Sequence, residues 1–202
     1  MNYDFQFDLL VLGSGAAGMT AAAVGAANGL DVIVIEKTGL IGGNTSFSGG
    51  MVYAPNNSKV AAAGKQDSFE DAMRYLDATV PTPEGRDMRA TFVRTAGQAI
   101  DYLERNTAVR LKPVPFYPDY YPENTGSKTG YRVLEPELFD GASLGKWFSK
   151  LRPPLPEFTI FGGMMISRDD LPHFRNLWKS PTSAARVVRL VMAHAWQRLF
   201  YR

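Results

Sequence analysis

The chain has 202 residues, of which 45% are hydrophobic and 21% are charged, so its composition is that of a globular protein able to bury a core. Its formal net charge of +2 is too close to neutral to indicate a nucleic-acid partner. The absence of cysteine excludes disulfides, thiolate metal sites and a redox-active dithiol. The two histidines stand in no metal-ligand spacing, so no metal site is expected.

A strand–turn–helix–strand pattern opens the chain. An apolar run at residues 7–12 leads into a glycine-rich turn, a helix of small residues follows over 19–28, and a second apolar run at 32–35 ends at Glu36. The turn consists of Gly13, Ser14, Gly15, Ala16, Ala17 and Gly18. This order is typical of a dinucleotide-binding βαβ unit, although an ordinary βαβ unit with a Gly-rich turn is the alternative.

Each part of this pattern has an expected role. Phosphates would lie at the helix N-terminus, and Glu36 would accept hydrogen bonds from ribose hydroxyls. Gly18, Ala22 and Ala26 recur at a spacing of four, which predicts that they share the helix face that lies against the sheet. Gly29 is expected to end the helix.

The same stretch carries no charge between Asp8 and Asp31, so a membrane span and a signal peptide have to be weighed. Its many glycines make a poor lipid-facing helix, and the residues before it are acidic rather than basic. We expect a buried parallel strand and a close-packed helix in a soluble, cytoplasmic protein without a membrane span.

A second glycine-rich segment covers residues 38–50. Two glycine pairs bracket small hydroxyl and amide side chains, so the segment offers backbone N–H donors with little steric bulk. A flexible surface loop is the alternative, but the position directly after the βαβ pattern favours a loop that contacts a cofactor.

Two helices are expected next, from Ser68 to about residue 80 and over 84–106. Pro81 and Pro83 separate them, and Gly97 indicates a close packing contact. Their predicted buried faces are Phe69, Ala72, Met73, Leu76 and Val80 in the first helix and Met88, Phe92, Ala96, Ile100 and Leu103 in the second.

Prolines and aromatics dominate residues 112–156, which predicts irregular coil with short strands. The clustered tyrosines are explained either by packing or by an apolar pocket lined with hydroxyl groups. A strand or turn is expected over 158–166 and a helix start over 169–172. The last helix, 182–200, has a basic face that we interpret as solvated. Its apolar face consists of Ala184, Val187, Val188, Val191, Ala195 and Leu199.

A hydrolase alternative rests on Gly141-Ala142-Ser143-Leu144-Gly145, which matches the nucleophile elbow G-x-S-x-G. The elbow needs a strand before the serine and a helix after it. Proline-rich coil precedes this serine, so the alternative is disfavoured.

The βαβ unit and the loop after it together resemble the FAD-dependent oxidoreductases of the fumarate reductase and succinate dehydrogenase flavoprotein superfamily. Disulfide reductases share the first motif but carry paired cysteines, which this chain lacks. The flavin-linking histidine of succinate dehydrogenase is also missing, so the resemblance implies non-covalent FAD. The residues that would bind it are those of the turn (Gly13, Ser14, Gly15, Ala16, Ala17 and Gly18), Glu36, Lys37, and in the loop Gly43, Asn44, Thr45, Ser48, Gly49 and Gly50.

A narrower resemblance, to 3-ketosteroid dehydrogenases, rests on short stretches along the rest of the chain. They are Pro55-Asn56-Asn57, Tyr117-Pro118-Asp119-Tyr120-Tyr121-Pro122-Glu123, Arg132-Val133-Leu134-Glu135-Pro136, Leu144-Gly145 and Leu151-Arg152-Pro153. The resemblance implies dehydrogenation of a CH–CH bond in a 3-oxosteroid ring, with hydride transfer to flavin N5. It implies Tyr120 as a catalytic residue, with Phe116 and Tyr121 against the steroid.

The resemblance implies an α/β, Rossmann-like FAD-binding fold with a parallel sheet, followed by helices and the irregular aromatic segment. Family members are more than twice as long, so residues 1–202 are expected to be the N-terminal part of the FAD domain, without the cap or catalytic domain. Its expected parts are the βαβ unit with the Gly-rich loop (1–57), a helical insertion (58–111), the aromatic segment (112–166) and the C-terminal helix (167–202). A second chain would then supply the missing half. Two other functions are alternatives to steroid dehydrogenation: that of a fumarate-reductase-like flavoprotein, or that of an inactive flavin-binding remnant.

Overall fold

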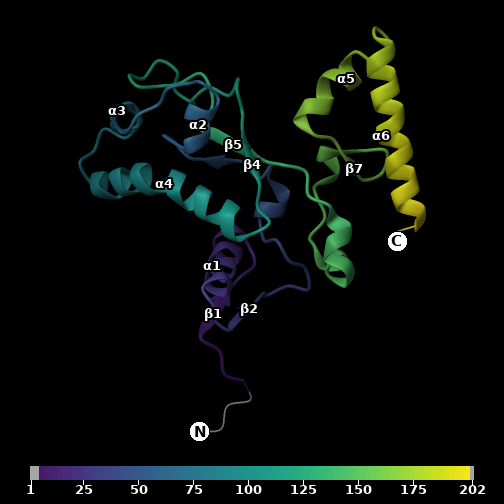
Figure 1. The fold of residues 1–202 in the computed structure, drawn as a ribbon, viewed down its shortest axis with the longest axis horizontal. Coiled ribbons are helices and arrows are strands. Elements are labelled where there is room, and N and C mark those ends of the chain that lie inside the picture. The colour runs from purple at the N-terminus through teal and green to yellow at the C-terminus, as the bar shows by residue number, and fades with distance from the viewer. Residues whose placement is uncertain (1–4, 201–202) are drawn as a thin grey trace. The chain divides into compact units, whose positions relative to one another are not determined.

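The computed structural model describes residues 5–200, which divide into two compact units. The first unit is Met1–Glu137 and the second is Leu138–Arg202, and each is described by itself. Figure 1 shows the order of the elements along the chain.

The first unit begins with the βαβ element that the sequence predicts. Strand β1 (Leu9–Leu12), helix α1 (Ala16–Ala27) and strand β2 (Val32–Ile35) follow one another. The two strands pair in parallel, with Leu9 opposite Val32. Helix α1 packs along this pair, so the predicted parallel α/β architecture is confirmed as a two-stranded parallel sheet (Figure 1).

Close packing of α1 on the strands depends on two glycines. A Cβ at Gly18 would lie 1.9 Å from the Gly13 carbonyl oxygen, and one at Gly25 would lie 2.7 Å from the Leu9 side chain. Ala22 is buried between them, whereas Ala26 is exposed, so the prediction that Ala26 shares this face is wrong. A helix turns 100° per residue, so a strict spacing of four drifts by 40° at each step, and Gly25 occupies the position assigned to Ala26.

Helix α1 ends as predicted at Gly29, whose φ of +82° suits glycine. The Leu30 N–H donates to the Gly25 carbonyl at 3.1 Å, and the Gly29 N–H donates to the Ala26 carbonyl at 3.0 Å. These two bonds form a Schellman motif, which directs the chain back towards β2.

Within residues 5–200, a single face of this two-stranded sheet is covered. Val11 is buried, but Leu10, Leu12 and Ile35 are exposed. The expectation of a buried strand is therefore wrong for most of β1 within residues 5–200, because α1 packs on a single face of the pair.

A second, antiparallel sheet has the order β3-β5-β4. Its strands are β3 (Val52–Tyr53), β5 (Val133–Pro136) and β4 (Leu111–Pro113). Short helix α2 (Ser58–Ala62) has Asn57 as its N-cap, and the Asn57 side chain accepts a hydrogen bond from the Lys59 N–H at 3.1 Å. A buried core cluster joins the sheet to the following helices and consists of Ala54, Ile100, Leu111 and Leu134.

Helices α3 (Phe69–Thr79) and α4 (Arg86–Asn106) pack against each other (Figure 1). The Ser68 hydroxyl accepts a hydrogen bond from the Asp71 N–H at 3.0 Å, which confirms the predicted start of α3. The tight contact expected at Gly97 is present, since a Cβ there would lie 3.2 Å from the Asn57 Cα.

The buried faces of α3 and α4 differ in part from the predicted ones. Their shared core consists of Ala72, Met73, Ala90 and Val93. Tyr75 is also buried, whereas Val80 caps the end of α3 and is exposed. Met88 is 74% exposed and Phe92 is exposed, because α4 presents Ala90 and Val93 to α3 instead.

The second unit is built of short elements and one long helix. Its 3-10 helices are Gly141–Lys150, Pro156–Phe158 and Arg168–Asp170, and its α-helices are α5 (Leu171–Arg175) and α6 (Pro181–Phe200). Within 158–166, where the sequence predicts a strand or a turn, β6 (Thr159–Ile160) and β7 (Met164–Met165) form an antiparallel hairpin. Ser143 lies in a 3-10 helix rather than between a strand and an α-helix, which argues against the hydrolase alternative.

Helix α6 buries only part of its predicted apolar face. Val187 is buried, but Val188, Ala195 and Leu199 are exposed. The inner side of the helix also carries a polar contact, in which Arg186 Nε donates to Asp170 Oδ1 at 2.8 Å. Over residues 5–200, none of the helices has both the length and the apolar character needed to span a membrane.

The packing at Gly18 yields a direct test. Gly18→Ala is expected to lower the free energy of unfolding by roughly 1–3 kcal/mol or more, because its Cβ would overlap the Gly13 carbonyl. Gly39→Ala is the matched control, since a Cβ at Gly39 meets nothing within 4 Å. Urea denaturation measures both, and equal stability of the two variants would contradict the close approach.

Candidate functional site

The glycine turn presents the N-terminus of α1 without a covering side chain. Gly13 has a φ of +92°, and its N–H donates to the Ile35 carbonyl at 2.7 Å, which holds the turn over the end of β2. Gly15 caps the helix with no side chain, and a Cβ there would approach only Thr45 Oγ1, at 3.7 Å. The turn therefore places no side chain of its own over the helix N-terminus, where backbone amides can face an anionic ligand.

Ser14 connects the turn to the end of β2 and to the glycine-rich loop. It is buried, and both its N–H (2.9 Å) and its hydroxyl (2.6 Å) donate to Glu36 Oε2. The same hydroxyl accepts a hydrogen bond from the Gly42 N–H at 3.0 Å. The turn after β1, the end of β2 and the glycine-rich loop thus meet at one hydroxyl group.

These bonds fix the charge of Glu36. The hydroxyl and then the N–H of Ser14, followed by the N–H of Thr38, lower the pKa of Glu36 from 4.5 to about 2. Glu36 is therefore an ionised acceptor at neutral pH. The sequence analysis predicts this residue but not its bonds with Ser14, since the two lie 22 residues apart.

The glycine-rich loop lies directly on the turn. Gly43, with a φ of +54°, comes so close to Gly15 that a Cβ at Gly43 would lie 3.1 Å from the Gly15 Cα. Thr45 Oγ1 accepts a hydrogen bond from the Ala16 N–H at 2.9 Å. The loop therefore borders the helix N-terminus with small and hydroxyl groups.

The remaining predicted cofactor residues occupy the outer part of this loop. Ser48 Oγ donates to the Thr45 carbonyl at 2.8 Å and accepts from the Gly50 N–H at 3.0 Å. Gly50 leads to the second sheet, where a Cβ at Gly50 would lie 3.1 Å from the Pro136 side chain. Lys37, Asn44 and Gly49 are exposed.

The residues of this cradle fit FAD. The helix N-terminus suits a pyrophosphate, the glycines let it approach the backbone, and an ionised carboxylate stands at the end of β2 for ribose hydroxyls. Glu36 Oε1 accepts longer hydrogen bonds, at 3.2 Å from the N–H and 3.3 Å from the hydroxyl of Thr38. This oxygen is the one that a ribose hydroxyl can engage without displacing Ser14.

The three predicted substrate residues lie on the loop between β4 and β5. Phe116 is 91% exposed and Tyr120 is 83% exposed, and Tyr121 is also exposed. A hydrogen bond with Tyr117 raises the pKa of Tyr120. The hydrogen bonds of this loop run to α3, whereas those of the cradle join β1, β2 and the glycine-rich loop.

The sequence analysis misses a buried charge cluster beneath this aromatic loop. Arg132 is 1% exposed and binds the carboxylate of Asp67 at 2.7 and 2.9 Å and that of Asp119 at 2.6 Å. The neighbouring Tyr53 hydroxyl is buried without a hydrogen-bond partner in the described part of the chain, and burial raises its pKa. The partners of Arg132 lie 13 and 65 residues away, so no local pattern indicates them.

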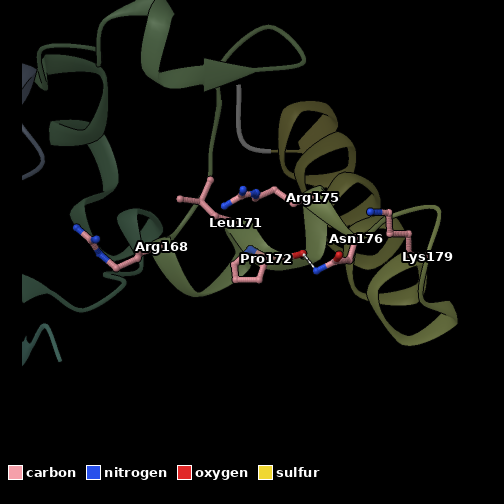
Figure 2. Close-up of a pocket in the computed structure, with 6 residues that line it drawn as sticks. All are labelled: Arg168, Leu171, Pro172, Arg175, Asn176 and Lys179. Carbon is pink, nitrogen blue, oxygen red and sulfur yellow. Dashed lines mark hydrogen bonds between the residues drawn. The ribbon is translucent and has the colours of Figure 1, made fainter. Parts of the chain in front are cut away.

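The second unit contains a hollow that is lined by other residues. It measures about 550 Å³ and is lined by Arg168, Leu171, Pro172, Arg175, Asn176 and Lys179 (Figure 2). Asn176 Nδ2 donates to the Pro172 carbonyl at 2.9 Å, and both residues line the hollow. None of the residues predicted to bind cofactor or substrate lines this hollow.

The pKa of Glu36 yields a test of the cradle. Glu36→Gln is expected to weaken FAD binding by about tenfold or more, because an ionised acceptor is lost. The contribution of this carboxylate to stability is complete above about pH 4.5 and is lost as the pH falls towards 2, because the folded pKa is the lower one. Fluorescence titration with FAD and unfolding curves at several pH values measure these effects.

Asp31→Asn is the control, since it removes the same charge at the opposite end of β2. It should leave FAD binding unchanged. Equal weakening in the two variants would show that net charge, rather than the position of Glu36, governs the affinity.

Comparison with known proteins identifies relatives along the whole chain. The chain is 31% identical over 194 residues to a 3-oxosteroid 1-dehydrogenase of Mycolicibacterium smegmatis, covering 96% of this chain and 34% of that protein. It is 34% identical over 201 residues to a 4-oxocyclohex-2-ene-1-carboxylate 5-dehydrogenase of Sinomonas cyclohexanicum, covering 100% of this chain and 34% of that protein. The chain thus spans about a third of the length of these relatives.

A solved structure matches the fold as well. It is the 3-ketosteroid delta1-dehydrogenase of Sterolibacterium denitrificans in complex with 1,4-androstadiene-3,17-dione, with a TM-score of 0.79 and 36% sequence identity over 91% of this chain and 32% of that one. These matches confirm the resemblance to 3-ketosteroid dehydrogenases. The model of the FAD binding domain family matches residues 8–202, and the chain therefore belongs to this family, whose cofactor is FAD.

Proposed function

We propose that the protein containing this chain is an FAD-dependent dehydrogenase that introduces a C=C bond into the ring of a 3-oxosteroid. The observation that carries the proposal is the presence, in one unit, of an FAD cradle and an exposed aromatic loop that carries Tyr120. The similarity to 3-oxosteroid 1-dehydrogenases supports this choice of substrate. A cytoplasmic location remains a prediction from the sequence.

The residues of the chain have separate roles in this proposal. The turn and the loop hold the pyrophosphate, Glu36 holds the ribose, and the cofactor is bound without a covalent link. When bound, FAD supplies the hydride acceptor for the oxidation. The overall reaction removes a hydride and a proton from adjacent ring carbons, which leaves the new double bond.

The aromatic loop would contact the substrate. Phe116 and Tyr121 offer apolar ring surface that suits a fused, apolar ring system. Tyr120 is the proposed catalytic residue of this chain, because its hydroxyl can donate a hydrogen bond to an oxygen of the substrate. Such a bond stabilises negative charge that develops on a ketone oxygen as the adjacent proton leaves.

A second candidate substrate is a smaller cyclic ketone that carries a ring carboxylate. The Sinomonas cyclohexanicum relative, named for such a compound, matches the whole chain. Both candidates share a ring CH–CH bond beside a ketone. A fumarate-like diacid is less favoured, because no arginine lies between Lys112 and Lys128 and Arg132 is committed to two aspartates.

Anaerobic mixing of the FAD-loaded protein with a 3-oxosteroid tests the proposal. We expect loss of the oxidised-flavin absorbance, and Tyr120→Phe should slow it by about a hundredfold. Tyr102→Phe, which removes a hydroxyl that accepts a hydrogen bond from Asn28 at 2.7 Å, should leave the rate unchanged. Bleaching by an oxocyclohexane carboxylate alone would favour the second substrate, and bleaching by neither would overturn the proposal.

A further inference from the structure

The aromatic loop is held against α3 along its length, although its aromatic tips are exposed. Lys128 Nζ binds Asp71 Oδ2 at 2.8 Å, and Asn124 Nδ2 donates to Thr79 Oγ1 at 3.1 Å. Gly126 lies so close that a Cβ there would be 2.3 Å from the Asp71 carbonyl oxygen. The loop is therefore docked backbone to backbone on this helix.

The base of the loop contains a buried charge cluster, which we call the Arg132 clamp and define as Asp67, Asp119 and Arg132. Each side chain is 1% exposed. Asp67 engages Arg132 with both oxygens, at 2.7 and 2.9 Å, and Asp119 engages it at 2.6 Å. Burial lowers the pKa of Arg132, but the hydrogen bond with Asp67 and the attraction of Asp67, Tyr53 and Asp119 together raise it above its ordinary value, so the guanidinium stays charged.

The clamp also uses backbone donors, which offset its second negative charge. Asp67 accepts hydrogen bonds from the Asn56 N–H at 2.9 Å and the Ser68 N–H at 3.0 Å. Asp119 accepts one from the Lys128 N–H at 2.9 Å. The cluster thus connects the start of α3, both sides of the aromatic loop and the residue before β5.

These contacts fix the backbone on both sides of Tyr120. Asp119, the preceding residue, is held by Arg132 and by a bond from its own N–H to the Lys128 carbonyl at 2.9 Å. The N–H of Tyr121, the following residue, donates to the Tyr75 hydroxyl at 3.3 Å, and the Tyr75 ring lies 5.6 Å from the Arg132 guanidinium. A rigid backbone therefore carries a side chain that is itself 83% exposed.

Stability alone is a weak explanation for such a cluster. Burying three charges costs free energy of desolvation, and apolar residues of similar volume often serve the fold as well. A cluster of this kind does, however, specify one geometry, because its hydrogen bonds are directional. Catalytic groups need that kind of support, since small displacements cost rate.

We propose that the Arg132 clamp and Tyr75 are positioning residues that set the place of the Tyr120 hydroxyl relative to the substrate. The proposal rests on the proposed function of Tyr120. Loss of the clamp displaces Tyr120 without removing it, so kcat falls more than KM rises.

A double-mutant cycle in the FAD-loaded protein that contains this chain tests the proposal. Asp119→Asn is expected to lower kcat for ring dehydrogenation by tenfold to a hundredfold in the presence of Tyr120 and to have little further effect in the Tyr120→Phe background. Tyr75→Phe, which keeps the ring and loses only the acceptor for the Tyr121 N–H, should act in the same way by severalfold. This second variant serves where Asp119→Asn does not fold.

Asp170→Asn is the matched control, because Asp170 is also a buried aspartate paired with an arginine, at 2.8 Å from Arg186. Its effect on kcat should be small and additive with that of Tyr120→Phe. Additive effects of the clamp variants would overturn the inference and show a purely structural role. Failure of the wild-type protein to oxidise any of the ring ketones would instead overturn the proposed function itself.

Discussion

The hydroxyl of Ser14 joins the three segments on which the cofactor cradle depends. It donates to Glu36 at the end of β2 and accepts from Gly42 in the glycine-rich loop, while its own backbone forms the turn after β1. Because it is buried, these bonds are not weakened by exchange with water. The position of the carboxylate, its ionised state and the approach of the loop all follow from this one group.

A second constraint is the distance between α1 and its strands. Gly18 and Gly25 let the helix backbone come close to β1, and this brings the helix N-terminus to the end of the strand. The same arrangement covers one face of the parallel pair and leaves Leu10, Leu12 and Ile35 exposed on the other. Parallel sheets are usually covered on both faces. Within residues 5–200, no second layer of helices covers this exposed apolar face of the sheet.

Local signals in the sequence predict local structure well. The serine cap of α3 and the glycine at the end of α1 both lie where expected, because a cap is a contact between residues three or four apart. The predicted faces fail where the spacing drifts, as at Ala26, or where a neighbouring helix selects another face, as at Met88. These choices depend on tertiary packing, which apolar periodicity alone does not contain.

Long-range polar contacts are the part of the site that sequence reasoning does not reach. Arg132 and Asp119 both lie in segments that resemble 3-ketosteroid dehydrogenases, yet nothing in those segments pairs them with Asp67. The same holds for Ser14 and Glu36, which are individually predicted to bind cofactor but bond to each other. In both cases, a buried and directional hydrogen bond joins residues that no local pattern in the sequence pairs.

The cradle is proposed to recognise the pyrophosphate and the adenosine ribose of FAD. Competition for FAD binding to the cofactor-free protein measures this recognition, because ADP carries both groups and riboflavin carries neither. We expect ADP to displace FAD and riboflavin to leave it bound. Displacement by riboflavin, with no effect of saturating ADP, would contradict this proposal.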